Sequence, residues 1–110
     1  MDFVSAYALT LAVETAVLLL LLRGKHAARV IMRNSIAANT LTLPFVWFFF
    51  PLLGLTYGAQ IAASEFFAFA TEAGVYAALF AGMTGREALA ASFLANAASF
   101  LLGLALTGIA

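Results

Sequence analysis

The stretch REALAASFLANAAS, residues 86–99, decides the fold because it repeats an earlier stretch, RVIMRNSIAANTLT, residues 29–42. The two stretches align without a gap, and their polar positions pair as Arg29 with Arg86, Ser35 with Ser92, Asn39 with Asn96, and Thr42 with Ser99. A glutamate precedes each copy inside an apolar run, Glu14 before the first and Glu72 before the second. The sequence therefore predicts a duplicated unit, in which a helix with a central glutamate leads through a basic turn to a helix carrying Ser-x-x-x-Asn-x-x-Thr/Ser.

The composition indicates that lipid, rather than water, surrounds this chain. Of its 110 residues, 65% are hydrophobic and 9% are charged, whereas a soluble domain carries about 25% charged residues. Four apolar runs cover nearly the whole chain, and each is long enough to cross a hydrocarbon core, which takes about 20 helical residues. We therefore predict one transmembrane domain over residues 1–110, with helices at about 3–22, 32–53, 59–81 and 87–109.

The two predicted hairpins run in the same direction across the membrane. The predicted fold class is therefore all-α, a polytopic membrane four-helix bundle made of two parallel-repeat helical hairpins. Parallel repeats are related by a pseudo-two-fold axis along the membrane normal. That symmetry would bring Glu14, Asn39, Glu72 and Asn96 together near the middle of the bilayer.

The distribution of charge predicts the orientation of the chain. The basic residues all follow the first or the third predicted helix: Arg23, Lys25, Arg29, Arg33 and Arg86. By the positive-inside rule these turns are cytoplasmic, so both termini are extracytoplasmic and the protein lies in the inner (plasma) membrane. Anionic lipid headgroups explain the basic cluster, and we expect no nucleic-acid partner for so apolar a chain with zero net charge.

The candidate site for an ion or substrate is a set of polar side chains at mid-bilayer depth. A charge at this depth costs about 2.5–3.5 kcal/mol on insertion scales. The four apolar runs contain no Lys or Arg that could pair with a buried glutamate. A protonated glutamate can donate to an asparagine oxygen, and an ionised one can accept from the amide or hold a cation. Glu65 and Tyr76 share a helix face with Glu72, and the predicted ion- or substrate-binding set is Glu14, Asn39, Glu72, Asn96, Glu65 and Tyr76.

Polar residues also hold membrane helices together, with contacts worth about 0.6–2 kcal/mol. We interpret Ser35, Ser92, Thr42 and Ser99 as such interhelical hydrogen-bonding groups. For Asn39 and Asn96, a role in helix packing and a role in ligand binding are equally consistent with the sequence. The sequence leaves open whether a metal or a cofactor is bound; it lacks cysteine, so it provides no thiolate ligand.

The order of these motifs resembles a set of small four-helix prokaryotic membrane proteins of unassigned function. They share a glutamate in the first and third helices, an Asn-x-x-Thr-x-Pro-x-x-Trp string in the second, and Ser-x-x-x-Asn-x-x-Ser-x-x-x-Gly in the fourth. The strings fall here on Asn39, Thr42, Pro44 and Trp47, and on Ser92, Asn96, Ser99 and Gly103. The resemblance covers most of the chain and implies a fold without an activity.

The chain is also similar to the small multidrug resistance transporters in its length, its helix count and the glutamate in the middle of its first helix. That similarity implies a proton and cation site at Glu14. The Trp and Gly pattern of that family's third helix is missing from this sequence, so nothing else is carried over from it.

Three functions fit these observations. The residues favour proton- or cation-linked transport or conduction by a homo-oligomer, with Glu14 and Glu72 as the binding pair. The alternative is a structural or assembly subunit whose polar stripes pair with other membrane subunits. The third is an intramembrane enzyme that uses two carboxyl groups as acid and base, although the sequence carries no histidine cluster and no recognisable catalytic motif.

Overall fold

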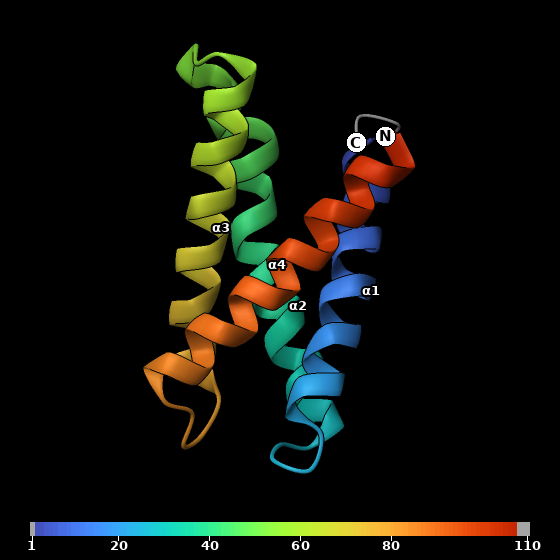
Figure 1. The fold of residues 1–110 in the computed structure, drawn as a ribbon, viewed down its shortest axis with the longest axis vertical. Helices are drawn as coiled ribbons and strands as arrows, with labels where there is room; N and C mark the ends of the chain where they lie inside the picture. The colour runs from blue at the N-terminus through green and yellow to red at the C-terminus, as the bar shows by residue number, and fades with distance from the viewer. Residues whose placement is uncertain (1, 108–110) are drawn as a thin grey trace.

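The computed structural model describes residues 2–107, which form a bundle of four α-helices joined by short connections (Figure 1). The helices are α1 (Phe3–Leu22), α2 (Ala28–Pro44), α3 (Tyr57–Leu79) and α4 (Gly85–Thr107). Between α2 and α3 the chain continues as a π-helix, η1 (Phe45–Phe49), and a 3-10 helix, η2 (Phe50–Leu53). The predicted all-α class is confirmed for the described part of the chain.

The second helix differs most from its predicted limits. It begins at Ala28, rather than at about residue 32, because the basic residues after the turn already belong to its first turns. Regular α-helix then ends at Pro44, where the missing N–H removes one backbone hydrogen bond and the ring crowds the carbonyl one turn earlier. The wider π-turn of η1 follows directly, so the predicted single helix over 32–53 consists of three different helical segments.

The helices form a ring in which α1 packs on α2 and α4, and α3 packs on α2 and α4 (Figure 1). The turns at residues 23–27 and 80–84 lie at one end of the bundle, which we call the basic end because it carries all the lysines and arginines. The start of α1 and the η2 segment lie at the other end. The longest dimension is 41 Å, close to the 40–45 Å of a bilayer with its headgroups.

The distribution of side chains in the bundle is the reverse of that in a soluble helical protein, whose exposed faces are polar. Large apolar side chains lie on the outside, such as Val4 at 73% exposed and Phe66 at 69% exposed. The buried polar side chains are Glu14, Asn34, Ser35, Asn39, Thr42, Ser64, Glu72, Ser92 and Asn96. Such a surface is suited to lipid, and several of the buried polar groups form hydrogen bonds with one another, such as Thr42 with Glu72 and Asn96 with Glu72.

Three helical segments in the described residues are long and apolar enough to cross a membrane: Phe3–Leu22, Ala28–Leu53 and Gly85–Leu106. The sequence analysis expected four. The exception is α3, which is long enough at about 34 Å for 23 residues but is less apolar than the others. Its polar residues include Ser64 and Glu72, which are buried within the bundle, and Glu65, which is half-buried.

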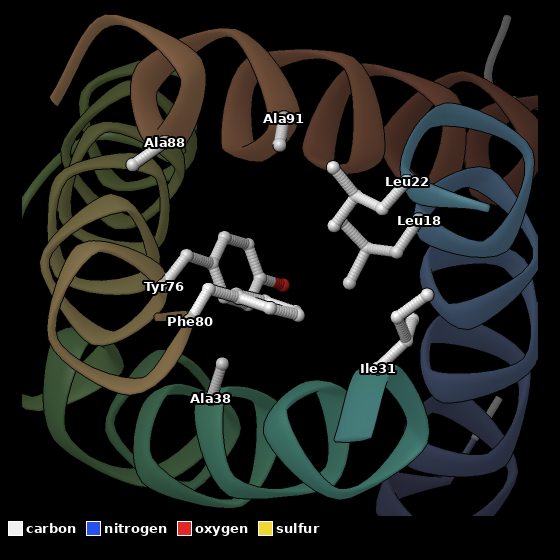
Figure 2. Packing of buried hydrophobic residues seen from close by; sticks show 8 residues of the cluster. All are labelled: Leu18, Leu22, Ile31, Ala38, Tyr76, Phe80, Ala88 and Ala91. Carbon is white, nitrogen blue, oxygen red and sulfur yellow. The ribbon is translucent and has the colours of Figure 1, made fainter. Parts of the chain in front are cut away.

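An apolar cluster fills the interior between the central glutamates and the basic end. Figure 2 shows its eight side chains converging on the space between the four helices: two each from α1, α2 and α4, Tyr76 from α3, and Phe80, which directly follows α3. They are Leu18, Leu22, Ile31, Ala38, Tyr76, Phe80, Ala88 and Ala91, and we call this cluster the basic-end plug. Tyr76 and Phe80 are its largest members, with ring centroids 5.9 Å apart, and His26 packs edge-on against Phe80 at 4.7 Å.

Candidate functional site

Each central glutamate accepts a hydrogen bond from a hydroxyl group of the other half of the chain. The Thr42 hydroxyl of α2 donates to Glu72 Oε2 of α3 at 2.7 Å. The Ser99 hydroxyl of α4 donates to Glu14 Oε2 of α1 at 2.8 Å. Thr42 and Ser99 are the last pair of matched polar positions in the two aligned stretches, and their hydrogen bonds run between the two halves of the chain in opposite directions.

The two asparagines share one contact and differ in another. Both donate from the side-chain amide to the carbonyl oxygen one turn earlier, Asn39 to Ser35 and Asn96 to Ser92, at 2.9 Å in each case. Asn96 Nδ2 also donates to Glu72 Oε1 at 3.0 Å. Asn39 makes no hydrogen bond to a glutamate among the described residues, and its Oδ1 is buried without a partner there.

The carboxyl groups of Glu14 and Glu72 are close enough to interact electrostatically, and both are almost completely buried. Both oxygens of Glu72 accept hydrogen bonds, from Thr42 and Asn96. By contrast, Glu14 Oε1 has no hydrogen-bond partner of good geometry among residues 2–107. Glu72 is therefore arranged as an ionised acceptor, whereas Glu14 retains one oxygen that is free to carry a proton or to contact a cation.

A cavity of about 500 Å³ leads to this carboxyl pair, and its lining comes from all four helices. At the end opposite the basic turns it is lined by Trp47, Pro51 and Tyr57, of which the last two are exposed. Deeper in the bundle the lining includes Glu65, and the cavity reaches its most central polar residues at Glu14, Glu72, Asn96 and Ser99. No residue of the basic-end plug lines this cavity, and we call it the crevice.

The crevice brings together four of the six predicted site residues: Glu14, Glu72, Asn96 and Glu65. Asn39 and Tyr76 are buried and do not line the crevice. Tyr76 is fully buried in the basic-end plug, where it interacts electrostatically with both central glutamates, and its hydroxyl has no hydrogen-bond partner among the described residues.

Sequence reasoning did not assign Thr42 and Ser99 to the site, because it treated them as groups that join helices. They do join helices, but they do so through the glutamate carboxyl groups. Their matched positions at the end of the two aligned stretches could have indicated that both belong to the site. Nothing in the sequence pattern indicated that Trp47 and Tyr57 would line the crevice, because their positions depend on how the chain turns after Pro44.

A metal centre finds no support in the described residues, which contain no group of three or more His, Cys, Asp or Glu side chains arranged to hold an ion. Comparison with protein-family models, with curated proteins and with solved structures finds no match to this chain. The resemblances of its motifs therefore carry no assignment of family or activity, and the function has to be argued from the site itself.

Proposed function

We propose that the protein transports protons or small cations across a membrane, with Glu14 and Glu72 as the binding pair. One observation carries this proposal: a crevice open at the end without basic residues reaches two buried carboxyl groups, while the basic-end plug fills the interior beyond them. This is the arrangement of a central binding site that is accessible from one side and closed on the other.

The membrane setting is supported by the apolar exterior and by three helices of sufficient length and hydropathy. In this proposal α3 is the fourth crossing, because its polar residues turn toward the crevice and its neighbours α2 and α4 cover that face. The positive-inside rule then places the basic end in the cytoplasm and the mouth of the crevice outside the inner membrane.

The proposed repeat supports a paired site. If the two hairpins are related by a pseudo-two-fold axis, Thr42 and Ser99 are equivalent, and so are Glu14 and Glu72. The crosswise hydrogen bonds at 2.7 and 2.8 Å are what such a relation requires. The extra bond from Asn96 to Glu72 makes the two carboxyl groups chemically different, which suits a pair that shares a single charge.

The chemistry of the pair follows from its surroundings. Two like charges that interact in a low-dielectric interior repel strongly, and the lysines and arginines of the chain all lie at the basic end. The pair therefore binds a proton or a cation to relieve that repulsion. We assign the exchangeable proton to Glu14 Oε1, the oxygen without a well-placed partner, and the lasting negative charge to Glu72.

The orientation of the polar stripes favours transport over the role of assembly subunit. A subunit that recruits partner helices through polar stripes would present them on its outer surface. Here the glutamates and asparagines at mid-depth are buried, and the large side chains on the outer surface are mainly apolar. A homo-oligomer remains part of the proposal, since its contacts would be made by that apolar surface.

The proposal is tested by following the protonated carboxyl groups by infrared spectroscopy in protein reconstituted into vesicles. We expect a carboxyl band that disappears as the external pH rises, shifts when Na⁺ or K⁺ is added, and is lost in Glu14→Gln. Both Glu14→Gln and Glu72→Gln should reduce proton flux across the vesicle membrane at least tenfold. Glu87→Gln is the matched control, because Glu87 pairs with Lys25 at the surface of the basic end.

The result that would overturn the proposal is a carboxyl signal that ignores both pH and cations, together with unchanged flux in the two Gln variants. The central glutamates would then serve only as hydrogen-bonding groups between helices. Normal folding of the variants, followed by their thermal unfolding in micelles, separates lost transport from lost structure.

A further inference from the structure

Three oxygen atoms in the interior of the bundle have no hydrogen-bond partner of good geometry among residues 2–107. They are Glu14 Oε1 of α1, Asn39 Oδ1 of α2 and the hydroxyl oxygen of Tyr76 in α3. Their side chains are 1%, 0% and 0% exposed, respectively. A buried polar group without a partner costs about 1–3 kcal/mol, so a ligand that satisfies all three would be bound favourably.

The packing of α2 on α3 places Asn39 and Tyr76 in the same layer of the bundle. The two helices run in opposite directions (Figure 1), and Thr42 of α2 donates to Glu72 of α3 across their contact. Residues one turn before Thr42 therefore face residues one turn after Glu72. Asn39 and Tyr76 occupy these positions, and both are fully buried. Figure 2 shows the Tyr76 hydroxyl directed into the space between the four helices.

Glu14 borders the same layer from α1. Its neighbour Thr15 shares a hydrogen bond of 2.7 Å with the Ser35 hydroxyl of α2, and the Ser35 carbonyl accepts from the Asn39 amide. The Tyr76 side chain interacts electrostatically with Glu14. The three unpartnered oxygens therefore surround one small region on the basic-end side of the carboxyl pair, which we call the inner region.

The inner region presents oxygen atoms and no nitrogen. The Ser35 carbonyl can only accept a hydrogen bond, so the nitrogen of the Asn39 amide faces that carbonyl and Oδ1 is left for a ligand. Carboxylate, amide and hydroxyl oxygens are the donors that hard cations prefer. One carboxyl group and two neutral oxygens differ from the clusters of His, Cys, Asp and Glu that hold transition metals, which residues 2–107 do not form.

The number of ligands and the small space select a monovalent cation. Ca²⁺ takes about 6–8 oxygen ligands and Mg²⁺ gives up its water reluctantly, whereas the inner region offers three protein oxygens. Neither Asn39 nor Tyr76 lines the crevice, so an occupant has to pass beyond the crevice and lose most of its water. Na⁺ is smaller than K⁺ and is the better fit among closely packed side chains.

We propose that Glu14 Oε1, Asn39 Oδ1 and the Tyr76 hydroxyl form an inner site for a partly dehydrated Na⁺, which competes with a proton for Glu14. This inference rests on the proposed function and names the ion. As Na⁺ binds, Glu14 releases its proton to water in the crevice, so one positive charge replaces another and the net charge of the carboxyl pair stays the same. Water from the crevice completes the coordination.

The competition predicts how Na⁺ binding depends on pH. The titratable groups that interact electrostatically with Glu14 are Glu72, Glu65 and Tyr76, all on α3, whereas α4 faces it with the neutral Ser99 and α2 with the neutral Asn39. Because the cation binds the deprotonated ligand, a fall in pH should weaken Na⁺ binding. Where Glu14 is mainly protonated, each pH unit should weaken it about tenfold.

The inner site is tested by equilibrium binding of radioactive Na⁺ to the full chain in detergent micelles. We expect saturable binding of one Na⁺ per chain, with K⁺ competing only at concentrations at least tenfold higher. Tyr76→Phe should weaken Na⁺ binding at least tenfold, although the ring and its packing in the basic-end plug remain. Tyr7→Phe is the matched control and should leave binding unchanged, because the Tyr7 hydroxyl pairs with Thr40 and does not line the crevice.

A second pair of variants tests the amide ligand. Asn39→Leu should also weaken Na⁺ binding at least tenfold. Asn34→Leu is the matched control, because Asn34 is a buried amide of the same helix with an unpartnered nitrogen and lies about 7.5 Å nearer the basic end. It should leave Na⁺ binding unchanged. Thermal unfolding verifies that each variant is folded, and Tyr76→Phe decides the outcome if Asn39→Leu is not.

Two results would overturn the inference. One is the absence of saturable Na⁺ binding to the wild-type chain. The other is equal Na⁺ affinity in the wild type, Asn39→Leu and Tyr76→Phe, which would assign the three oxygens to a buried water molecule. Failure of the proposed function looks different: Na⁺ would bind as expected and depend on Asn39 and Tyr76, but Glu14→Gln and Glu72→Gln would leave proton flux intact.

Discussion

At the scale of single residues, the site depends on hydroxyl groups that orient carboxyl groups. Thr42 and Ser99 each donate one hydrogen bond across a helix–helix contact to a buried glutamate. Without such a donor, a carboxylate oxygen inside the bundle has no substitute for water. These two side chains therefore fix the positions of Glu72 and Glu14 and lower the free energy of the charged form.

We expect Thr42→Val and Ser99→Ala each to reduce the free energy of unfolding by about 1–3 kcal/mol, because each leaves a buried acceptor without its donor. Denaturation in micelles, followed by circular dichroism, measures the change. Thr40→Val is the control, since the Thr40 hydroxyl pairs with Tyr7 on an exposed face and should cost less than about 1 kcal/mol. A loss as large in the control would show that the carboxyl groups are not what makes the two hydroxyls important.

At the scale of elements, the basic-end plug separates the crevice from the basic end. Its members come from all four helices and from Phe80, the residue that follows α3, so the plug joins the four helices at this end. Phe80 is the largest apolar member, is 2% exposed, and also meets the ring of His26. The plug is thus both the main apolar core of the bundle and the closed side of the proposed pathway.

We expect Phe80→Ala to reduce the free energy of unfolding by about 3–5 kcal/mol, because it leaves a large cavity in the core. The same variant should increase passive proton leakage across vesicles, since the new space lies between the carboxyl pair and the basic end. Thermal unfolding and leakage of a pH-sensitive dye measure the two effects. Phe66→Ala, at an exposed position in α3, should change neither, and leakage equal in both variants would contradict a sealing role for the plug.

The elements and much of the site could be predicted from the sequence because hydropathy and repetition act locally. The limits of α1 and the depth of Glu14 and Glu72 follow from counting residues in apolar runs. The crevice could not be predicted in this way, because it depends on the turn that follows Pro44 and on the angle between α3 and α4. Asn39 and Asn96 are identical in pattern, yet only Asn96 contacts a glutamate, because side-chain contacts depend on helix rotation.

At the scale of the whole molecule, one end is basic and the other holds the mouth of the crevice. The 41 Å length and the apolar exterior suit a single passage through a bilayer for each helix. Orientation then decides which compartment supplies the crevice. In the proposed orientation, that compartment lies outside the cytoplasm.

The orientation can be tested cleanly because the chain contains no cysteine. We expect a membrane-impermeant maleimide, added to intact cells, to label Leu55→Cys in the turn before α3 and to leave Lys25→Cys unlabelled until the cells are opened. Both positions are exposed in the structure, so reactivity reports the side of the membrane rather than burial. The opposite labelling pattern would reverse the direction of the proposed transport.

If the chain crosses a membrane as proposed, the polar face of α3 also affects how the chain is inserted during synthesis. The ribosome completes α3 before α4 exists, so Glu65 and Glu72 emerge while half of the helix neighbours that shield them are still missing. A helix of this kind integrates poorly alone. Because the turn at residues 80–84 is short, α3 and α4 are suited to leave the insertion machinery together as a hairpin, with the last helix made completing the integration of the one before it.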